Sequence, residues 1–458
     1  GGLGVLAWFV AARTHPAAAV GTALALVGAL TWAGLVGNLG LGSLLVGLLP
    51  KARRAERAAI AGTAAVTATA VGALVGLAVA VALRLIGGGL AAAAGRPVIV
   101  AALAVGGAGW SAGVVLDHVA VAGAQPRLTV IRAAVGGTVR LLLIGLGLVI
   151  GWRTGTALVV GWAAAIAIGT AAEAVLLWSH HQLSVHRRVV EATWAPLARR
   201  GMATHYGVNV LGQTPPMALP VVLAVARRPV QAAAFGAAWQ IASTVGLLSP
   251  AVATGRRLLA IVVPASVVVA ALAPQLLGLI GPEYVVTGTT ALRILALGLI
   301  ADALSNIEIA RLRIGERFRS AIAINGTILA VTLASAAALV ASWGASGAAT
   351  GWLLGEVAGV AVALLSIRLV RSRSTHHADL ARLRVAPSRP GERRGAAHAP
   401  PRRRPAGHGP RGGGAARHRR RPAAVPDPRV GPAPAFDRPG PGDDFAACRD
   451  HVRYLLGL

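Results

Sequence analysis

The stretch LVGNLGLGSLLVGLLPKARRAER, residues 35–57, passes abruptly from apolar residues to a proline and then to a burst of positive charge. Such a change is typical of a helix that leaves the lipid bilayer on the cytoplasmic side, where Lys and Arg are retained. The glycines have a separate meaning, because helices in lipid associate where small residues let their backbones approach. We therefore expect a spanning helix over 20–49, with Gly34, Asn38 and Gly42 on one contact face.

The composition of the whole chain agrees with a membrane protein. Of 458 residues, 55% are hydrophobic and only 13% are charged, and the mean hydropathy is +0.67. A soluble domain of this length is far less apolar. The single cysteine, Cys448, excludes an internal disulfide, and no Cys/His spacing indicates a zinc site. We expect neither a metal nor a cofactor.

Apolar stretches that are long enough to cross the bilayer follow one another along the chain. The opening residues, GGLGVLAWFVAA, are too short to span and are expected to be the second half of a truncated first helix. With that fragment, the sequence predicts an all-α integral membrane protein with about twelve transmembrane helices in two six-helix lobes. The other expected spans are 20–49, 60–83, 97–121, 128–151, 155–178, 202–226, 231–252, 258–280, 286–310, 319–342 and 347–370.

Basic residues alternate between the connections. The even-numbered connections hold Lys51, Arg53, Arg54, Arg57, Arg127, Arg132, Arg187, Arg188, Arg199, Arg200, Arg256, Arg257, Arg311, Arg313, Arg317 and Arg319. The odd-numbered ones hold only Arg13, Arg84, Arg96, Arg153, Arg227 and Arg228. The positive-inside rule then places the even connections and both termini in the cytoplasm. The expected location is a bacterial cytoplasmic membrane.

Four regions follow from these patterns. They are an N-terminal lobe over 1–180, a basic cytoplasmic linker over 181–200, a C-terminal lobe over 201–371 and a tail over 372–458. The linker has apolar residues among its charges and is expected to lie as an amphipathic helix on the cytoplasmic surface. The tail is rich in Arg, Pro and Gly without apolar periodicity, so disorder is expected. It is either a binder of anionic lipid headgroups or the product of a frameshift in GC-rich DNA; nucleic acid is not an expected partner.

Three stretches resemble the polysaccharide-exporting branch of the multidrug/oligosaccharidyl-lipid/polysaccharide exporter superfamily. They are VAARTHPAAAVGTALALVGALTWAGLVGNLGLGSLLVGLLPKA, VLDHVAVAGAQPRLTVIRAAVGGTVRLLLI and LAPQLLGLIGPEYVVTGTTALRILALG. The likeness spans roughly residues 5 to 371, and the incomplete first helix, the short VATGRRLLA loop and the tail depart from it. The resemblance implies an alternating-access flippase whose central cavity receives a polyprenyl-diphosphate-linked glycan, a function that needs no enzyme chemistry.

Charged residues inside the bilayer are costly, so those that persist usually face a cavity or a partner. Arg132 and Arg140 lie about two turns apart on one predicted helix. Either guanidinium could bind a diphosphate in the cavity, form an ion pair with Asp117, or, for Arg132, reach the interface. Asp117 and His118 form either a proton-responsive pair or a hydrogen-bonded anchor between helices. The resemblance also supports Asp117, because it matches an acid in the family's fourth helix.

Two further helices carry polar residues at helical spacing. His205, Asn209 and Gln213 share one face of the predicted seventh helix, just before Pro215, Pro216 and Pro220, and indicate either a bending, cavity-lining helix or simple hydrogen bonding between helices.

In the tenth predicted helix, Asp302 and Asn306 share a face that is a candidate for the cavity. Glu308 and Arg311 are spaced for a structural ion pair. Glu173 and Glu356 lie in late turns of their spans, where they are expected to reach water.

Two other functions compete with the flippase. A cation or drug antiporter of the same superfamily would differ in the charge of its substrate. A membrane glycan polymerase or ligase would need a sizeable external loop, and every predicted external loop is short. The sequence also lacks a nucleophile elbow or a metal-binding motif.

Overall fold

The computed structural model describes the backbone of residues 2–184, 187–246 and 255–384, and all of the regular structure in these ranges is helical. Side chains are not described at 54, 55, 187–205, 246, 255–258 and 367–384. The chain divides into two units, 1–370 and 371–458. The tail predicted over 372–458 falls in the second unit and lies almost entirely outside the described residues, so its predicted disorder stays a prediction.

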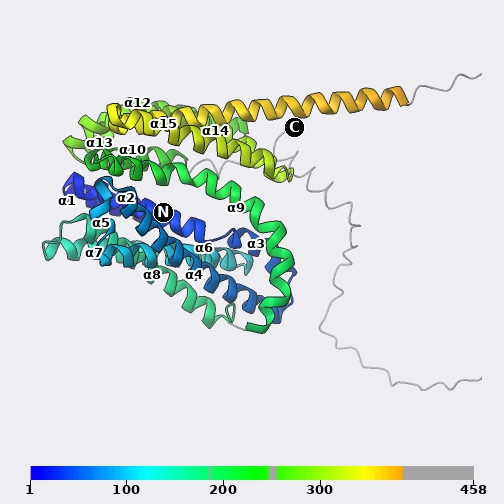
Figure 1. The fold of residues 1–458 in the computed structure, drawn as a ribbon, viewed down its shortest axis with the longest axis horizontal. Coiled ribbons are helices and arrows are strands. Elements are labelled where there is room, and N and C mark those ends of the chain that lie inside the picture. The colour runs from blue at the N-terminus through cyan, green and yellow to red at the C-terminus, as the bar shows by residue number, and fades with distance from the viewer. Residues whose placement is uncertain (1, 185–186, 247–254, 385–458) are drawn as a thin grey trace, which may run out of the picture. The chain divides into compact units, whose positions relative to one another are not determined.

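The first half of the first unit, residues 2–184, contains eight α-helices and two short 3₁₀ helices among the described residues (Figure 1). They are α1 (Gly2–Thr14), α2 (Ala17–Gly37), α3 (Leu41–Leu48), η1 (Leu49–Lys51), α4 (Arg54–Ile86), η2 (Gly88–Leu90), α5 (Ala91–Ala94), α6 (Pro97–Ala122), α7 (Arg127–Val149) and α8 (Gly155–Ser179).

The second half of this unit, residues 187–370, is built from long helices joined by short turns (Figure 1). They are α9 (Arg187–Val225), α10 (Pro229–Gly246), α12 (Gly255–Ala271), α13 (Ala273–Gly278), α14 (Pro282–Ile314) and α15 (Phe318–Arg384), which continues into the second unit.

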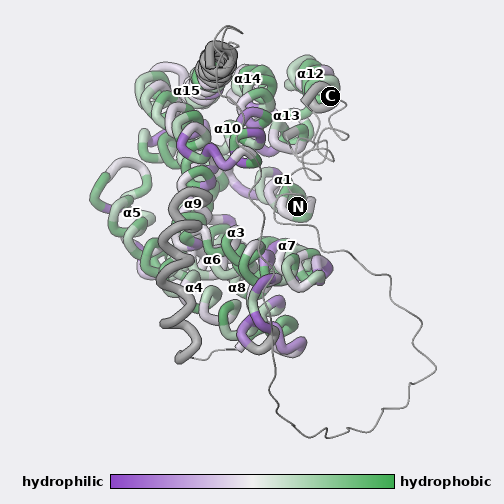
Figure 2. The backbone as a smooth tube through the Cα atoms, turned by 90° about the vertical axis from the view of Figure 1, so that its right-hand side faces the viewer, coloured by the Kyte–Doolittle hydropathy of each residue, from purple (hydrophilic) through white to green (hydrophobic). Residues whose placement is uncertain are grey.

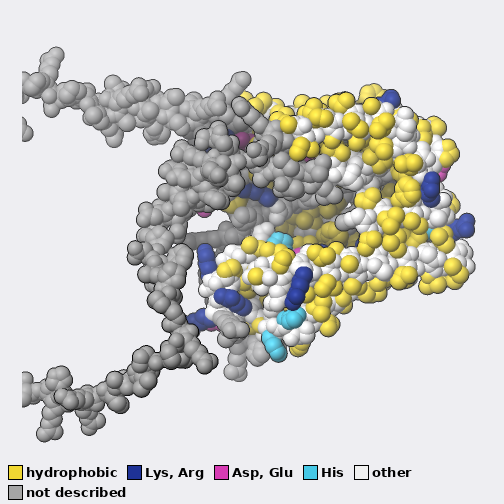
Figure 3. Space-filling model, turned by 180° about the vertical axis from the view of Figure 1, so that it is seen from behind, with side chains coloured by type: hydrophobic (Ala, Val, Ile, Leu, Met, Phe, Trp, Pro, Cys, Tyr) yellow, Lys and Arg dark blue, Asp and Glu magenta, His cyan; other side chains and the backbone are white. Residues whose placement is uncertain are grey.

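The described helices confirm an all-α membrane fold. Eight are long and apolar enough to cross a bilayer, and α1, α3 with η1, and α12 are shorter apolar helices. Figure 2 shows green hydrophobic tubes interrupted by short purple hydrophilic segments. Figure 3 shows yellow hydrophobic side chains over most of the described surface. The helix α15 bends at Gly344, whose φ is +53°, and so covers both of the last two predicted spans, 319–342 and 347–370.

The helix predicted over 20–49 is wrong, because the chain turns between α2 and α3. Leu39 and Gly40 have φ values of +53° and +73°, which end one helix and begin the next. Gly34 and Gly42 nevertheless both face α6. A Cβ on Gly34 would lie 2.6 Å from Trp110, and a Cβ on Gly42 would lie 2.6 Å from His118. The turn changes the direction of the chain, so that α2 and α3 each pack against a different part of α6.

The separate amphipathic helix predicted over 181–200 is also not observed. The backbone of α9 runs without interruption from Arg187 to Val225 and so joins this segment to the predicted seventh helix. The helix continues through Pro215, Pro216 and Pro220. Proline is tolerated in such a position where neighbouring helices satisfy the freed carbonyls. The basic part of α9 lies outside the residues with described side chains.

Buried apolar residues form one cluster within each half and one between the halves. Leu41, Ile60, Val115 and Leu177 belong to a cluster confined to residues 41–177. A second cluster lies within residues 208–363, and the largest one joins α1 and α2 to α10 and α14. The core thus consists of contacts between helices, while the outer faces of the helices keep their apolar side chains exposed to the surroundings.

The helices α4 and α6 approach each other closely at a pair of glycines. A Cβ on Gly72 would lie 2.5 Å from the Gly107 carbonyl oxygen, and a Cβ on Gly107 would lie 2.6 Å from the Gly72 carbonyl oxygen. Because these neighbours are backbone atoms, they cannot move aside without displacing a helix. Small residues at this crossing are therefore required by the packing.

We expect Gly72→Leu to destabilise the fold by about 1–3 kcal/mol or more, because the new side chain forces α4 and α6 apart. Thermal unfolding of the purified protein in detergent measures the change. Gly145→Leu is the matched control, since nothing lies within 4 Å of the Cβ that Gly145 would carry. Equal melting temperatures for the two variants would contradict the close approach.

Candidate functional site

A buried ion cluster joins α6, α7 and α8. Arg132 Nε donates to Asp117 Oδ1 at 2.9 Å, and its Nη2 pairs with the other oxygen of the same carboxylate. The same Nε lies 3.2 Å from Glu173 Oε2. Glu173 is fully buried, whereas the Arg132 side chain keeps 22% of its exposure. One guanidinium is therefore shared by two carboxylates from two neighbouring helices.

Small residues create the space for this cluster. A Cβ on Gly113 would lie 3.2 Å from Arg132 Nη1 and 3.0 Å from Thr170 Oγ1. Thr170 Oγ1 also donates to the Gly109 carbonyl at 3.0 Å, which ties α8 to α6. The Arg132 guanidinium can reach from α7 to both α6 and α8 because Gly113 of α6 has no side chain to block it.

The expectation that Glu173 and Glu356 reach water is wrong for both residues. Glu173 is fully buried and Glu356 is 4% exposed. Glu173 lies late in α8 and Glu356 lies in the part of α15 that follows the kink at Gly344. Both are on faces that pack against other helices. For Glu173 the signal was present in the sequence, because Ala165 and Gly169 precede it at intervals of four residues and mark a close-packed face.

A second acidic cluster joins α14 and α15. Asn306 Nδ2 donates to Asp302 Oδ1 at 3.0 Å. Ser305 Oγ lies 3.0 Å from Glu356 Oε2 and 3.0 Å from the Asp302 carbonyl oxygen. Within the described ranges, no basic side chain forms an ion pair with Asp302 or Glu356. These two carboxylates thus have hydrogen-bond donors around them but no fixed positive charge.

The acids of the two clusters occupy corresponding helix positions. Asp117 lies 20 residues after Pro97, the first residue of α6, and Asp302 lies 20 residues after Pro282, the first residue of α14. The partner acids follow on later helices of each half. Only the first cluster contains an arginine among the described residues.

Arg140 lies apart from both acidic clusters. Its guanidinium carbon lies 3.7 Å from the centre of the Trp162 ring, and its Nε is buried without a hydrogen-bond partner. It lines a small cavity between α7 and α8 that His15 also lines. Burial lowers the pKa of His15, so this imidazole stays neutral beside the arginine at neutral pH. Arg140 is the only described charge on this wall.

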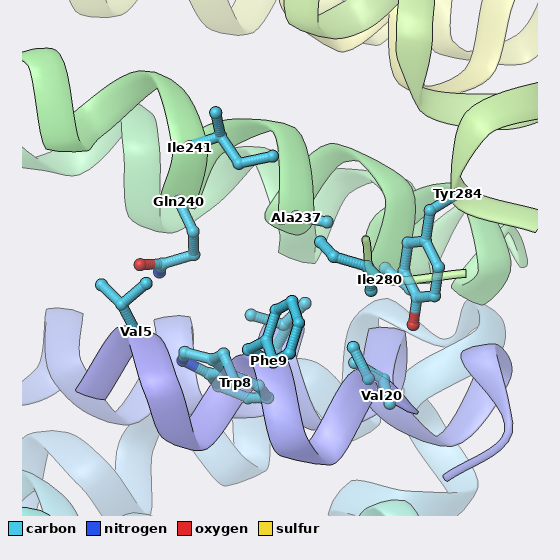
Figure 4. Close-up of a pocket in the computed structure, with 13 residues that line it drawn as sticks. Val5, Trp8, Phe9, Val20, Ala237, Gln240, Ile241, Ile280 and Tyr284 are labelled. Atoms are coloured by element: carbon cyan, nitrogen blue, oxygen red, sulfur yellow. The ribbon is translucent and has the colours of Figure 1, made fainter. Parts of the chain in front are cut away.

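The helices α1 and α2 meet α9 and α10 across two cavities. The smaller is lined by Trp8, Phe9 and Val20 on one side and by Gln240 and Tyr284 on the other (Figure 4). The adjacent cavity, of about 230 Å³, is lined by Trp8, Gln240 and the candidate residue Gln213. Both are mainly apolar. Trp8 stacks on Trp162 with ring centroids 4.3 Å apart, so this aromatic pair separates Arg140 from the cavities.

The other candidate residues have separate partners. Asn209 Oδ1 accepts a hydrogen bond from Arg313 Nη2 at 2.5 Å, which links α9 to the end of α14. His118 Nδ1 lies 2.6 Å from the Val114 carbonyl of its own helix and has no hydrogen bond to Asp117. His205 lies in α9, but its side chain is outside the described residues.

The structure therefore brings together Asp117 with Arg132 and Asp302 with Asn306, and does not gather the nine candidates into one site. Arg313 was missed because the sequence analysis ended this helix at 310, whereas α14 continues to Ile314. The intrahelical pair of Glu308 and Arg311 is present, with an N–O distance of 2.8 Å.

We expect Arg132→Gln to destabilise the protein by up to about 3–5 kcal/mol, because the buried Glu173 and the partly exposed Asp117 then lose the one cation that pairs with them among the described residues. Thermal unfolding in detergent provides the measurement, with Arg84→Gln as the control because Arg84 is exposed and forms no ion pair within the described part of the chain. Adding Glu173→Gln to Arg132→Gln should recover part of the loss. If the double variant instead loses the sum of the stabilities lost in the two single variants, the two acids do not share one guanidinium.

No protein-family model matches the sequence, and no curated protein matches it either. The fold does have solved relatives. A lipid II flippase, MurJ, in an inward closed conformation aligns with a TM-score of 0.61 over 80% of this chain and 85% of its own, at 9% identity. An inward-facing multidrug resistance MATE family transporter of the MOP superfamily aligns with a TM-score of 0.56 over 82% of this chain and 94% of its own, at 14% identity.

A third solved structure, a MOP superfamily transporter from Pyrococcus furiosus described as having a binding pocket of reversed polarity, has a TM-score of 0.52 and 14% identity. Its alignment covers 80% of this chain and 91% of its own. At these identities the likeness establishes the fold alone. The chain is a multi-pass membrane protein with the fold of the MOP superfamily transporters.

Proposed function

We propose that this protein moves a lipid-linked oligosaccharide across the bacterial cytoplasmic membrane by alternating access, for the synthesis of a cell-surface polysaccharide. The substrate class is a glycan carried on a polyprenyl diphosphate. The fold shared with a lipid II flippase supports the class of activity. The chemistry of this chain supports an anionic substrate, because Arg140 in a spanning helix has no acidic partner among the described residues.

Arg140 is the observation that carries this proposal. It lies in a spanning helix, half-buried, without a carboxylate partner among the described residues, and its Nε has no acceptor. An arginine without an anionic partner at this depth is costly. A diphosphate would satisfy the guanidinium through paired, charge-assisted hydrogen bonds. Arg132, by contrast, is already neutralised by two acids.

A route from the cavities to Arg140 runs past the stacked tryptophans. Trp8 lines both cavities between the halves, and its partner Trp162 supports the guanidinium. A shift of α1 that unstacks Trp8 from Trp162 would expose Arg140 to a substrate between the halves. Arg313, held by Asn209 across the unit's second half, adds a further guanidinium without an acidic partner in the described part of the chain.

The proposed mechanism uses two lobes of similar construction, residues 1–180 and 201–371, joined by 181–200. The matching positions of Asp117 and Asp302 after their helix-initiating prolines support an internal duplication. With the positive-inside rule, the connections that hold Lys51, Arg53 and Arg57 face the cytoplasm, as do both termini. The glycan would then enter from the inner leaflet and leave on the outside.

A cation antiporter is the second candidate. It is favoured by one observation, the pair of Asp302 and Glu356, which lack a basic partner in the described ranges. Two adjacent carboxylates in a low-dielectric environment would bind a cation or a proton. This function would make the acidic cluster of α14 and α15, rather than Arg140, the residues on which transport depends.

The test is translocation in liposomes that contain a fluorescent polyprenyl-diphosphate oligosaccharide, measured by the access of a membrane-impermeant quencher. We expect Arg140→Ala to slow translocation at least about tenfold, because a charged hydrogen bond contributes roughly 1.5–3 kcal/mol. The translocation rate of Arg140→Lys should lie between those of the unchanged protein and Arg140→Ala, because lysine keeps the charge but cannot form the paired hydrogen bonds of a guanidinium. The control is Arg84→Gln, with an exposed arginine.

Full translocation by Arg140→Ala would reject the anionic site. Absence of lipid movement, together with efflux of a cationic dye that is lost in Asp302→Asn, would establish the antiporter instead.

A further inference from the structure

A polar cavity of about 320 Å³ opens where α4, α6 and α8 meet η1, away from the acidic clusters and from Arg140. Arg57, His180, His181 and Gln182 line one wall, and apolar residues such as Val119 line another. On the face drawn in Figure 3, dark blue basic side chains and cyan histidine side chains lie close together at the lower left of the described surface. None of these residues belongs to the proposed transport route.

The Arg57 side chain is fixed in place by hydrogen bonds to the backbone. Arg57 Nε donates to the Ala52 carbonyl at 3.0 Å, and Nη2 donates to the Pro50 carbonyl at 3.0 Å. These bonds hold the plane of the guanidinium while the side chain remains exposed. Lys51 and Arg53 are exposed on the same connection, with Glu56 as the acid of this segment that has a described side chain. The local charge is therefore positive.

The two histidines are positioned by the end of α8. His181 has a φ of +55°, a conformation that glycine adopts more easily. The Gln182 N–H donates to the Leu177 carbonyl at 2.9 Å, and the His181 N–H donates to the Trp178 carbonyl at 2.9 Å, which closes the helix end. Both imidazoles are exposed and can donate hydrogen bonds to an anion.

Gln182 lines the cavity beside the histidines. Its Oε1 is buried, and a Cβ on Gly123 would lie 2.8 Å from it, so this oxygen packs against the end of α6 and does not face a ligand. Arg57, His180 and His181 are therefore the groups that can reach an anion in the cavity.

Exposed apolar residues in the last turns of α8, shortly before the histidines that line the cavity, favour a lipid over a soluble ligand. Trp178 is 61% exposed and Val175, about one turn earlier on α8, is 67% exposed. Exposed tryptophan is typical of the membrane–water interface, where its amphipathic ring lies at the level of the headgroups. A lipid whose headgroup fills the cavity could lay its acyl chains along these residues.

We infer that this cavity binds the phosphate of an anionic phospholipid headgroup. Arg57, His180 and His181 contact the phosphate. Basic pockets between helices on the cytoplasmic side are known to hold anionic headgroups. The site does not depend on which substrate the protein transports.

The experiment uses the full chain purified in detergent and titrated with phosphatidylglycerol or with phosphatidylcholine of the same acyl chains, followed by the melting temperature. We expect phosphatidylglycerol to raise the melting temperature and phosphatidylcholine to leave it unchanged. Arg57→Gln combined with His180→Gln should shift the phosphatidylglycerol midpoint about five- to tenfold higher. Arg96→Gln, an exposed arginine outside the cavity, is the control.

Arg57→Gln could impair folding, because it removes two hydrogen bonds to the backbone. The single variant His180→Gln avoids this problem, because the His180 side chain makes no hydrogen bond in the described structure. Equal stabilisation by phosphatidylcholine, or an unchanged midpoint in the cavity variants, would overturn the inference. An equal response to soluble glycerol phosphate at the same concentration would overturn the assignment to a lipid.

Discussion

Close backbone contact along α2 is the constraint on which the arrangement of the helices depends. A Cβ on Gly21 would collide with the Pro229 carbonyl oxygen, and one on Gly28 would lie 2.7 Å from the Met217 carbonyl oxygen. The same helix approaches α4 at Gly37 and α6 at Gly34. One helix without bulky side chains at these points thus contacts both halves. In lipid, where apolar surface gains nothing by leaving its surroundings, such contacts supply most of the attraction.

The buried charges follow from the same environment. A carboxylate between helices must find a cation, a proton or strong donors, because water is excluded. The first half meets this requirement with Arg132, whose guanidinium also joins three helices. The second half carries acids in matching register but surrounds them with Ser305 and Asn306. The first cluster is therefore suited to a fixed structure, whereas the second has no basic partner among the described residues.

The sequence predicts the spans well because the bilayer imposes a length and a polarity that are visible in each segment alone. Its errors occur where the outcome depends on a neighbouring helix. The turn at Leu39 and Gly40 lies inside an uninterrupted apolar run, and only its packing against α6 explains it. Arg313 was counted among loop residues, although α14 carries it to Asn209 of another helix. For Glu173, the small residues on its own face would have indicated burial.

The contact between the halves is suited to repeated separation. Its described side-chain hydrogen bonds are few: Trp32 Nε1 donates to Thr214 Oγ1 at 2.9 Å, and Tyr206 Oη donates to the Val36 carbonyl at 2.9 Å. Both connect α2 to α9. The remaining contacts across the cavities are largely apolar, and lipid or substrate chains can replace them at little cost. The charged clusters lie within a half, so the halves can move apart without breaking a buried ion pair.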